Sequence, residues 1–190
     1  TVAERDEAER NKLGLRYVRF LFAGPSVAGL LHADPHPGNF KVMSDGRLGV
    51  VDWGLVSRLP DGLPAAMGRL LRIAVREDAA GVTEGLKAEG FINRNADKVE
   101  PNELLDYLSP FLEPAEVDEF HFTRQWMQRE FKRVGDAKAN GKLLQQLNLP
   151  PSYALIHRVW LGGIAVLSQL DVRASFRSVL DEYLPQWQER

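Results

Sequence analysis

Two carboxylates and an amide lie close together in the sequence, on the turn-rich segment LLHADPHPGNF and on the apolar run that follows it. They are Asp34, Asn39 and Asp52. A carboxylate can orient or accept the proton of an attacking hydroxyl or water, and Asp34 is the candidate for this catalytic role. Carboxylate and amide oxygens are also the hard ligands that Mg²⁺ prefers, which suits Asn39 and Asp52. These residue types predict magnesium-assisted chemistry on the phosphates of a bound nucleotide.

The spacing of these residues favours phosphoryl transfer. His32, Asp34 and Asn39 follow the H-R-D-x-x-x-x-N pattern of a kinase catalytic loop. Asp52 begins Asp-Trp-Gly at the place where kinases have Asp-Phe-Gly, with Trp53 in the packing position. Three positions in a fixed order make this a much more specific signal than any one of them alone.

A predicted hairpin connects the two ends of this motif. Residues 39–43 and 48–53 are short β-prone runs, and the Asp45-Gly46 pair between them is a strong signal for a tight hairpin turn. Such a hairpin places Asn39 and Asp52 at one end of a rigid ribbon, where both could hold Mg²⁺ on the nucleotide phosphates.

The rest of the chain reads as helical. Leu13, Tyr17 and Leu21 recur at helical spacing and predict a helix over 1–22 that ends at Gly24-Pro25. The prolines and glycine of 35–38 exclude a regular element there. From Pro60 onward only helical patterns are found, over 63–77, 79–89, 101–112, 115–134, 137–147, 152–170 and 172–187. The predicted fold class is therefore mainly α with one small β-hairpin (α+β).

Composition narrows the function classes. The 190 residues carry 24 Lys+Arg against 26 Asp+Glu, so the chain has no net positive charge that would attract it to nucleic acid. The absence of cysteine excludes disulfides, zinc–thiolate sites and a thiol nucleophile. Hydrophobic residues make up 44% of the chain, which is enough for a core and excludes general disorder.

The segment HADPHPGNFKVMSDGRLGVVDWG resembles the catalytic segment of the UbiB/AarF family of atypical kinase-like proteins. The proline after the aspartate and the PHPGN ending are characteristic of that family. The helical remainder is similar to the family's C-terminal lobe, in LLRIAVREDAAGVTEGLKAEGF and in PPSYALIHRVWLGGIAVLSQLD. The resemblance covers nearly the whole chain and is most specific in His32–Gly54.

The resemblance implies a C-terminal lobe of a kinase-like fold as a single domain over 1–190. Residues 1–60 would carry the first helix, the catalytic loop, the hairpin and Asp-Trp-Gly, and 61–190 a helical bundle. It implies ATP with Mg²⁺ as cofactors, and a kinase or ATPase activity that supports ubiquinone or other isoprenoid-lipid metabolism. It also implies a lipid or quinone-precursor substrate and a cytoplasmic location with peripheral membrane association. No glycine-rich loop and no strand-borne lysine of an N-lobe are found, so this chain alone is expected to turn over little.

Other interpretations of the same residues stay open. An aminoglycoside-phosphotransferase-like kinase would share the His-x-Asp loop, although its usual Gly-Asp-Pro continuation is replaced here by SRLPDGLP. A pseudokinase-like scaffold would need no N-lobe. His32-x-Asp34-x-His36 could suit zinc or iron in a hydrolase, which the flanking prolines disfavour.

Structural roles are the plain alternative for each residue. Asp34 could shape a turn, Asn39 could end the loop and Asp52 could cap the next turn. His32 is expected to support the loop by packing rather than to take part in catalysis, and His157 is expected to have no site role.

Overall fold

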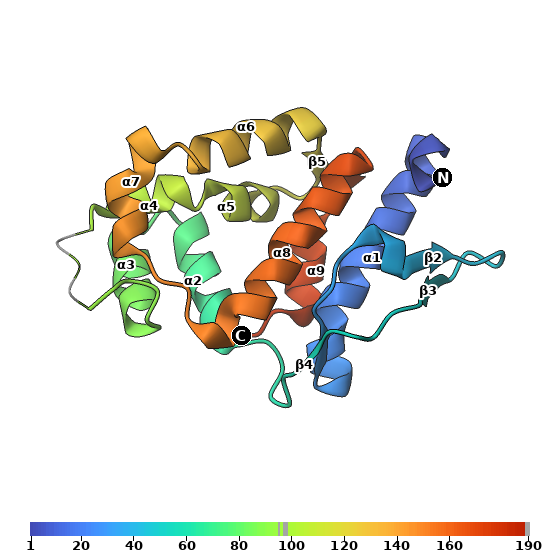
Figure 1. The fold of residues 1–190 in the computed structure, drawn as a ribbon, viewed down its shortest axis with the longest axis horizontal. Helices are drawn as coiled ribbons and strands as arrows, with labels where there is room; N and C mark the ends of the chain where they lie inside the picture. Colours follow the sequence, from blue (N-terminus) through green and yellow to red (C-terminus); the bar gives the residue numbers. More distant parts are fainter. Residues whose placement is uncertain (95, 97–98, 189–190) are drawn as a thin grey trace.

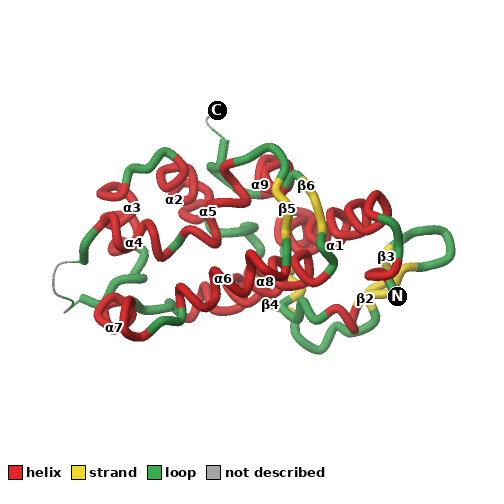
Figure 2. Tube along the Cα trace, turned by 90° about the horizontal axis from the view of Figure 1, so that it is seen from above, coloured by secondary structure: helices red, strands yellow, loops and turns green. Residues whose placement is uncertain are grey.

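The computed structural model describes residues 1–94, 96 and 99–188. In that part of the chain most of the regular structure is helical and every strand is short, which confirms the mainly α expectation (Figures 1 and 2). The α-helices are α1 (Glu7–Ala28), α2 (Ala65–Val75), α3 (Ala79–Ala88), α4 (Pro101–Tyr107), α5 (Ser109–Glu116), α6 (Arg124–Val134), α7 (Ala137–Gln146), α8 (Pro151–Gln169) and α9 (Phe176–Tyr183). Single 3-10 turns lie at η1 (Val2–Glu4) and η2 (Pro37–Asn39). The strands β1 (Leu30–His32), β2 (Phe40–Val42), β3 (Leu48–Val50), β4 (Val56–Arg58), β5 (Phe120–Phe122) and β6 (Val172–Ala174) form the antiparallel pairs β1–β4, β2–β3 and β5–β6.

The first helix lies six residues further along the chain than predicted, since it begins at Glu7. It continues through Gly24-Pro25 and ends at Gly29, whose left-handed backbone (φ 66°) closes the last turn. Pro25 lies inside the helix, where its missing N–H removes one helical hydrogen bond, and its ring is buried. Gly24 has a packing role instead, since a Cβ there would lie 2.4 Å from the carbonyl oxygen of Leu30. The expectation that the helix ends at this pair was therefore wrong.

The predicted hairpin is confirmed, with Phe40 opposite Val50 and Val42 opposite Leu48. Gly46 takes the positive φ (79°) that the tight turn requires. Strands β1 and β4 flank this hairpin in sequence and pair with each other, His32 opposite Val56, which sequence patterning did not indicate. The proline-rich loop also contains the 3-10 turn η2, so the exclusion of any regular element there was too strict.

The C-terminal half departs from its all-helical prediction at two places. The strands β5 and β6 pair over 50 residues of separation, with Phe122 and Val172 fully buried. Each strand is too short for a periodicity to reveal it, and only the distant partner makes it a strand. The helix predicted over 101–112 is divided at Leu108, because Pro110 has no N–H to continue the helical ladder.

Helix α8 is central to the fold. It packs against α1 and α6 (Figure 1), and its Trp160 contacts Phe176 of α9 at a ring-centroid distance of 5.7 Å. Most buried apolar residues form one main cluster around α1, α8 and α9, including Leu21, Leu167 and Leu180. A second cluster, made of Ile92, Val99, Leu104 and Leu143, lies among α4, α7 and the loops near them. No helix in the described ranges combines the length and the apolar character that a membrane span needs.

Candidate functional site

The loop after β1 brings Asp34 and Asn39 into contact. The η2 turn folds the chain back, so that Asn39 Nδ2 donates to Asp34 Oδ2 at 2.7 Å and to the Asp34 carbonyl at 3.3 Å. From α8, Arg158 Nη2 donates to Asp34 Oδ1 at 3.1 Å and Arg158 Nε donates to the carbonyl of Ala33. Both oxygens of the Asp34 carboxylate are therefore fixed in direction by the protein.

These contacts favour the ionised form of Asp34. The hydrogen bond from Asn39, followed by that from Arg158, holds the pKa of the Asp34 carboxyl below its ordinary value. A carboxylate with a lowered pKa is a weak proton acceptor at neutral pH but a good hydrogen-bond acceptor. Its position suits a group that orients an attacking hydroxyl or water.

The backbone beside Asp34 is held from two sides. Pro35 is buried, and its carbonyl accepts a hydrogen bond from the Tyr17 hydroxyl of α1. On the opposite side, a Cβ at Gly162 of α8 would lie only 2.2 Å from Cγ of Pro35, so a glycine is needed for this close approach. Burial, and to a smaller extent the negative charge of Asp34, raise the pKa of Tyr17, which keeps its hydroxyl protonated as a donor.

Two contacts position Asp52, one to its backbone carbonyl and one to its carboxylate. The His32 ring contacts the Asp52 carbonyl through Nε2 at 2.6 Å, and because a carbonyl can only accept, Nε2 carries the proton. The Asp52 carboxylate accepts from the Gly54 amide at 2.7 Å through Oδ1, while the side chain stays exposed. The Val51 amide donates to the Asn39 carbonyl at 3.0 Å, so the hairpin ends run side by side.

His32 is a packing residue, as its buried position (4% exposed) indicates. Its ring makes edge contacts with Phe20, Phe40 and Trp53, at centroid distances of 5.8, 5.5 and 5.3 Å. The Trp53 side chain is 57% exposed, so it fills the expected packing position only in part, through its edge contacts with His32 and Phe20. The His36 ring accepts the Gly38 amide through Nδ1, which shapes the loop.

The oxygens left free at this site suit magnesium. Asn39 uses its amide nitrogen on Asp34 and Asp52 uses Oδ1 on Gly54. Within the described part of the chain, Asn39 Oδ1 and Asp52 Oδ2 have no side-chain partner and are available to an ion. Among the described residues no group of three or more His, Asp or Glu is close enough to hold a metal by itself. Mg²⁺ in nucleotide sites is typically held by one or two protein ligands together with the phosphates and water, so the donor set fits that ion. It does not fit the zinc or iron alternative, which needs a cluster of protein ligands.

Two positioning residues were missed in the sequence. Tyr17 was assigned only to a helix face, and Arg158 lies inside the helix predicted over 152–170, most of which is apolar. A cation inside an otherwise apolar helix is a signal that a partner exists elsewhere in the fold. Its partner proved to be Asp34, 124 residues away in the chain.

Replacing Arg158 with alanine is expected to raise the pKa of Asp34 toward the ordinary aspartate value of about 3.9. The substitution removes one hydrogen bond to the ionised carboxylate and one nearby positive charge. Folding lowers the pKa of Asp34, so this contact stabilises the folded state at pH values above the ordinary aspartate pKa. The stabilisation is lost as the pH falls through the lowered pKa of the folded state. Carbon-13 NMR titration of the Asp34 carboxyl measures the change. Arg177→Ala removes an exposed charge of α9 and should leave that titration unaltered; an unchanged pKa in both variants would refute the assigned contact.

Known proteins are similar to this chain in the segment that carries the candidate site. Residues 1–86 match the family model of the ABC1 atypical kinase-like domain. The chloroplastic protein ACTIVITY OF BC1 COMPLEX KINASE 3 of Arabidopsis thaliana is 30% identical over 141 residues, which is 73% of this chain and 18% of that protein. ACTIVITY OF BC1 COMPLEX KINASE 1 of the same plant is 35% identical over 85 residues, 41% of this chain and 12% of that protein.

The fold also has a solved counterpart. The complex of Rv3197 with erythromycin from Mycobacterium tuberculosis superposes with a TM-score of 0.87 at 30% identity, over 100% of this chain and 47% of that one. This chain thus spans about half of the solved relative and less than a fifth of these two curated relatives.

Proposed function

Because this chain belongs to the UbiB/AarF family of atypical kinase-like proteins, we propose that its loop–hairpin segment binds Mg-ATP and promotes attack on the γ-phosphate. The observation that carries the proposal is the convergence of Asp34, Asn39 and the Asp52 segment at the start of one hairpin. The coarse kinase-like assignment follows from the family; the nucleotide, the ion and the reaction are proposed.

Each residue has a distinct role in this proposal. Asn39 Oδ1 and Asp52 Oδ2 would hold Mg²⁺, which when bound neutralises charge on the β- and γ-phosphates. Asp34 would accept a hydrogen bond from the attacking water or hydroxyl and direct its lone pair toward phosphorus, with ADP as the leaving group. Arg158 keeps Asp34 ionised and correctly turned, and Tyr17 with Gly162 fixes the loop on which Asp34 lies.

We also propose that the chain is the C-terminal lobe of the kinase-like fold, 1–60 carrying the site and 61–190 the helical body. The phosphate-covering lobe would then lie outside these residues. This is supported by the coverage of 47% of the solved relative, which leaves more than half of that relative unmatched. A lipid or quinone-precursor acceptor and peripheral membrane association remain part of the proposal through the family.

The two other interpretations are less well supported. The matching family model is the ABC1 domain, which favours the UbiB/AarF assignment over an aminoglycoside-phosphotransferase-like kinase. A pure scaffold has no evident need for Asn39 and Arg158 to orient both oxygens of Asp34.

Calorimetry with Mg-ATP on the full-length protein tests the proposal. Asp52→Asn is expected to lower ATP affinity in Mg²⁺ to the level found in EDTA, because it removes the anionic oxygen that holds the ion. The substitution should not unfold the chain, since the Asp52 side chain is exposed. Asp61→Asn, at an exposed aspartate in the turn between β4 and α2, is the control and should bind as the wild type does. Undiminished magnesium-dependent binding in Asp52→Asn would overturn the assignment.

A further inference from the structure

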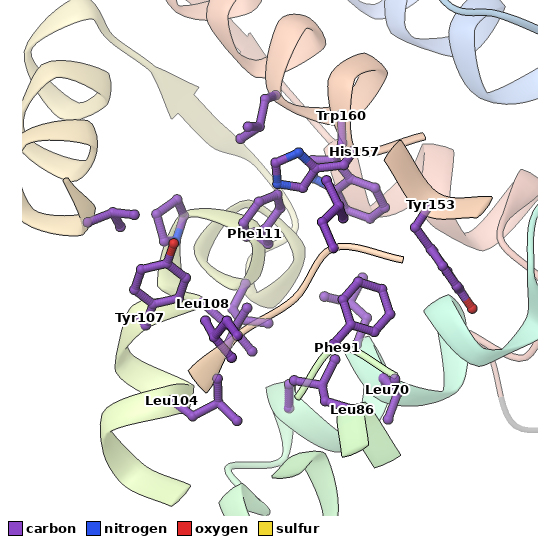
Figure 3. A pocket seen from close by; sticks show the side chains of 18 of the residues that line it. Leu70, Leu86, Phe91, Leu104, Tyr107, Leu108, Phe111, Tyr153, His157 and Trp160 are labelled. Carbon is purple, nitrogen blue, oxygen red and sulfur yellow. The ribbon is translucent and has the colours of Figure 1, made fainter. Parts of the chain in front are cut away.

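A cavity of about 570 Å³ lies between the main cluster and the second cluster of the core. Side chains of α2 to α8 form its wall, and Figure 3 shows that they surround an open space. Small-molecule sites in proteins have volumes of about 300–1,000 Å³, so this cavity is large enough for one. None of Asp34, Asn39 and Asp52 lines it, which makes it a site separate from the proposed phosphate site.

The wall of the cavity carries no formal charge. Among the described residues that line it there is no Asp, Glu, Lys or Arg. Leu104, Phe111 and Trp160 are typical of the lining, which is mostly aliphatic and aromatic and includes a few uncharged polar side chains such as Asn148. A charged ligand would lose its hydration here without gaining a partner, and this loss is costly. The cavity therefore selects for a neutral, apolar ligand.

Three side chains could still recognise a polar group. One is Trp160, whose buried Nε1 has no hydrogen-bond partner among the described residues. Tyr107 of α4 and His157 of α8 line the cavity, and neither makes a hydrogen bond to any residue that the structure describes. Figure 3 draws them with Phe111 between them, and the His157 ring packs against Phe111 at 5.7 Å. Burial raises the pKa of Tyr107 and lowers the pKa of His157, so both are neutral at pH 7. A neutral hydroxyl and a neutral imidazole can each donate or accept one hydrogen bond.

The cavity opens to solvent through apolar side chains. Phe131 (44% exposed), Leu144 (39%) and Leu149 (42%) come from three different segments, and all three line the same cavity. Isolated exposed apolar residues need no explanation, but several around one opening mark a binding site. Here they form an entrance by which an apolar molecule could reach the interior.

We propose that this cavity binds a neutral, mainly apolar small molecule with one hydrogen-bonding group, such as a long-chain alcohol. The apolar body would pack among Leu104, Phe111 and Trp160, and the hydroxyl would pair with Tyr107 or His157. The volume, the uncharged wall and the unpaired polar groups of Tyr107, His157 and Trp160 each point to this class of ligand rather than to an anionic lipid. The proposal does not depend on the phosphate site, and it can fail or hold while ATP binding is unaffected.

The test uses N-phenyl-1-naphthylamine, an uncharged fluorophore that brightens in apolar surroundings, titrated into the full-length protein. Saturable binding of one probe per chain is expected. Decanol should displace the probe, while decanoate, which has the same chain length but a charged end, should compete at least about tenfold more weakly. Absence of saturable binding, as would be found if another protein segment filled the cavity, or equal competition by decanol and decanoate, would refute the proposal.

A pair of variants locates the site. Leu144→Glu places a charge at the entrance and is expected to weaken probe binding about tenfold or more. Val117→Glu introduces the same charge at a residue of similar exposure (41%, against 39% for Leu144) that does not line the cavity, and should bind as the wild type does. Because both residues are exposed, both variants should fold, which circular dichroism verifies. Leu149→Trp, which narrows the same entrance without adding charge, should also weaken binding. Equal probe affinity in all three variants would place the bound probe elsewhere and overturn the assignment.

Discussion

Asp34→Asn is expected to lower ATP turnover by the full-length protein about 10²- to 10⁴-fold, the usual contribution of a positioned acid–base group. The amide can keep a hydrogen bond to Asn39 or Arg158, so the loop should keep its shape. It cannot supply the anionic oxygen that orients the attacking water or hydroxyl. Because Asp34 is not among the proposed metal ligands, Mg-ATP binding should stay close to that of the wild type. Steady-state phosphate release together with calorimetry separates these two effects.

Asp45→Asn is the matched control for this prediction. Asp45 lies in the turn of the same hairpin segment and pairs with Arg47, and hydrogen bonds from Arg47 lower the pKa of its carboxyl as well. Its side chain has no contact with Asn39 or Asp52 in the described structure, so its loss should leave turnover unchanged. Equal rates for Asp34→Asn and the wild type would favour the scaffold interpretation over an enzyme.

Gly162→Ala is expected to destabilise the protein by about 1–3 kcal/mol, the usual cost of overpacking a filled interior. The added methyl group would overlap the Pro35 ring, which is itself held by Tyr17, and neither the ring nor helix α8 can move freely. Thermal unfolding should shift down by several degrees, at about 2–4 °C per kcal/mol for a chain of this size. Turnover by the folded fraction should fall too, because a displaced Pro35 moves Asp34 away from Asn39.

The neighbouring glycine, Gly163, provides a control in which the expected change in stability has the opposite sign. A Cβ at Gly163 would meet Leu21 at 3.6 Å and Val18 at 3.9 Å, which are ordinary contacts. Gly163→Ala should therefore stabilise helix α8 by about 0.5–1 kcal/mol, through the lower backbone entropy of the unfolded chain. If the two substitutions shifted the unfolding temperature equally, the close approach of Gly162 to Pro35 would not be what constrains the loop.

Short sequence patterns predicted those parts of the site whose residues lie close together in the chain. The Asp-Gly pair predicted the hairpin, because a tight turn restricts the register and the direction of the two strands that it connects. The contact of Asp34 with Asn39 lies within a single loop of six residues, 34–39, so the spacing alone could suggest it. The order of these residues also suggested the family, and the family model matches the segment that contains them.

Contacts between distant segments could not be read in this way. The β5–β6 pair, the Tyr17 bond to Pro35 and the Arg158 bond to Asp34 each join residues that no short-range pattern relates.

By itself the sequence determined the chemical groups of the site, the hairpin that carries them and the helical character of the body. Only the tertiary structure decided that α8 presents Arg158 to Asp34 and His157 to the cavity from adjacent positions. Successive residues of a helix point about 100° apart, so neighbours in the chain can serve different sites. Which face meets which partner depends on how the helices pack, and packing is the sum of many weak contacts that no single segment of the sequence contains.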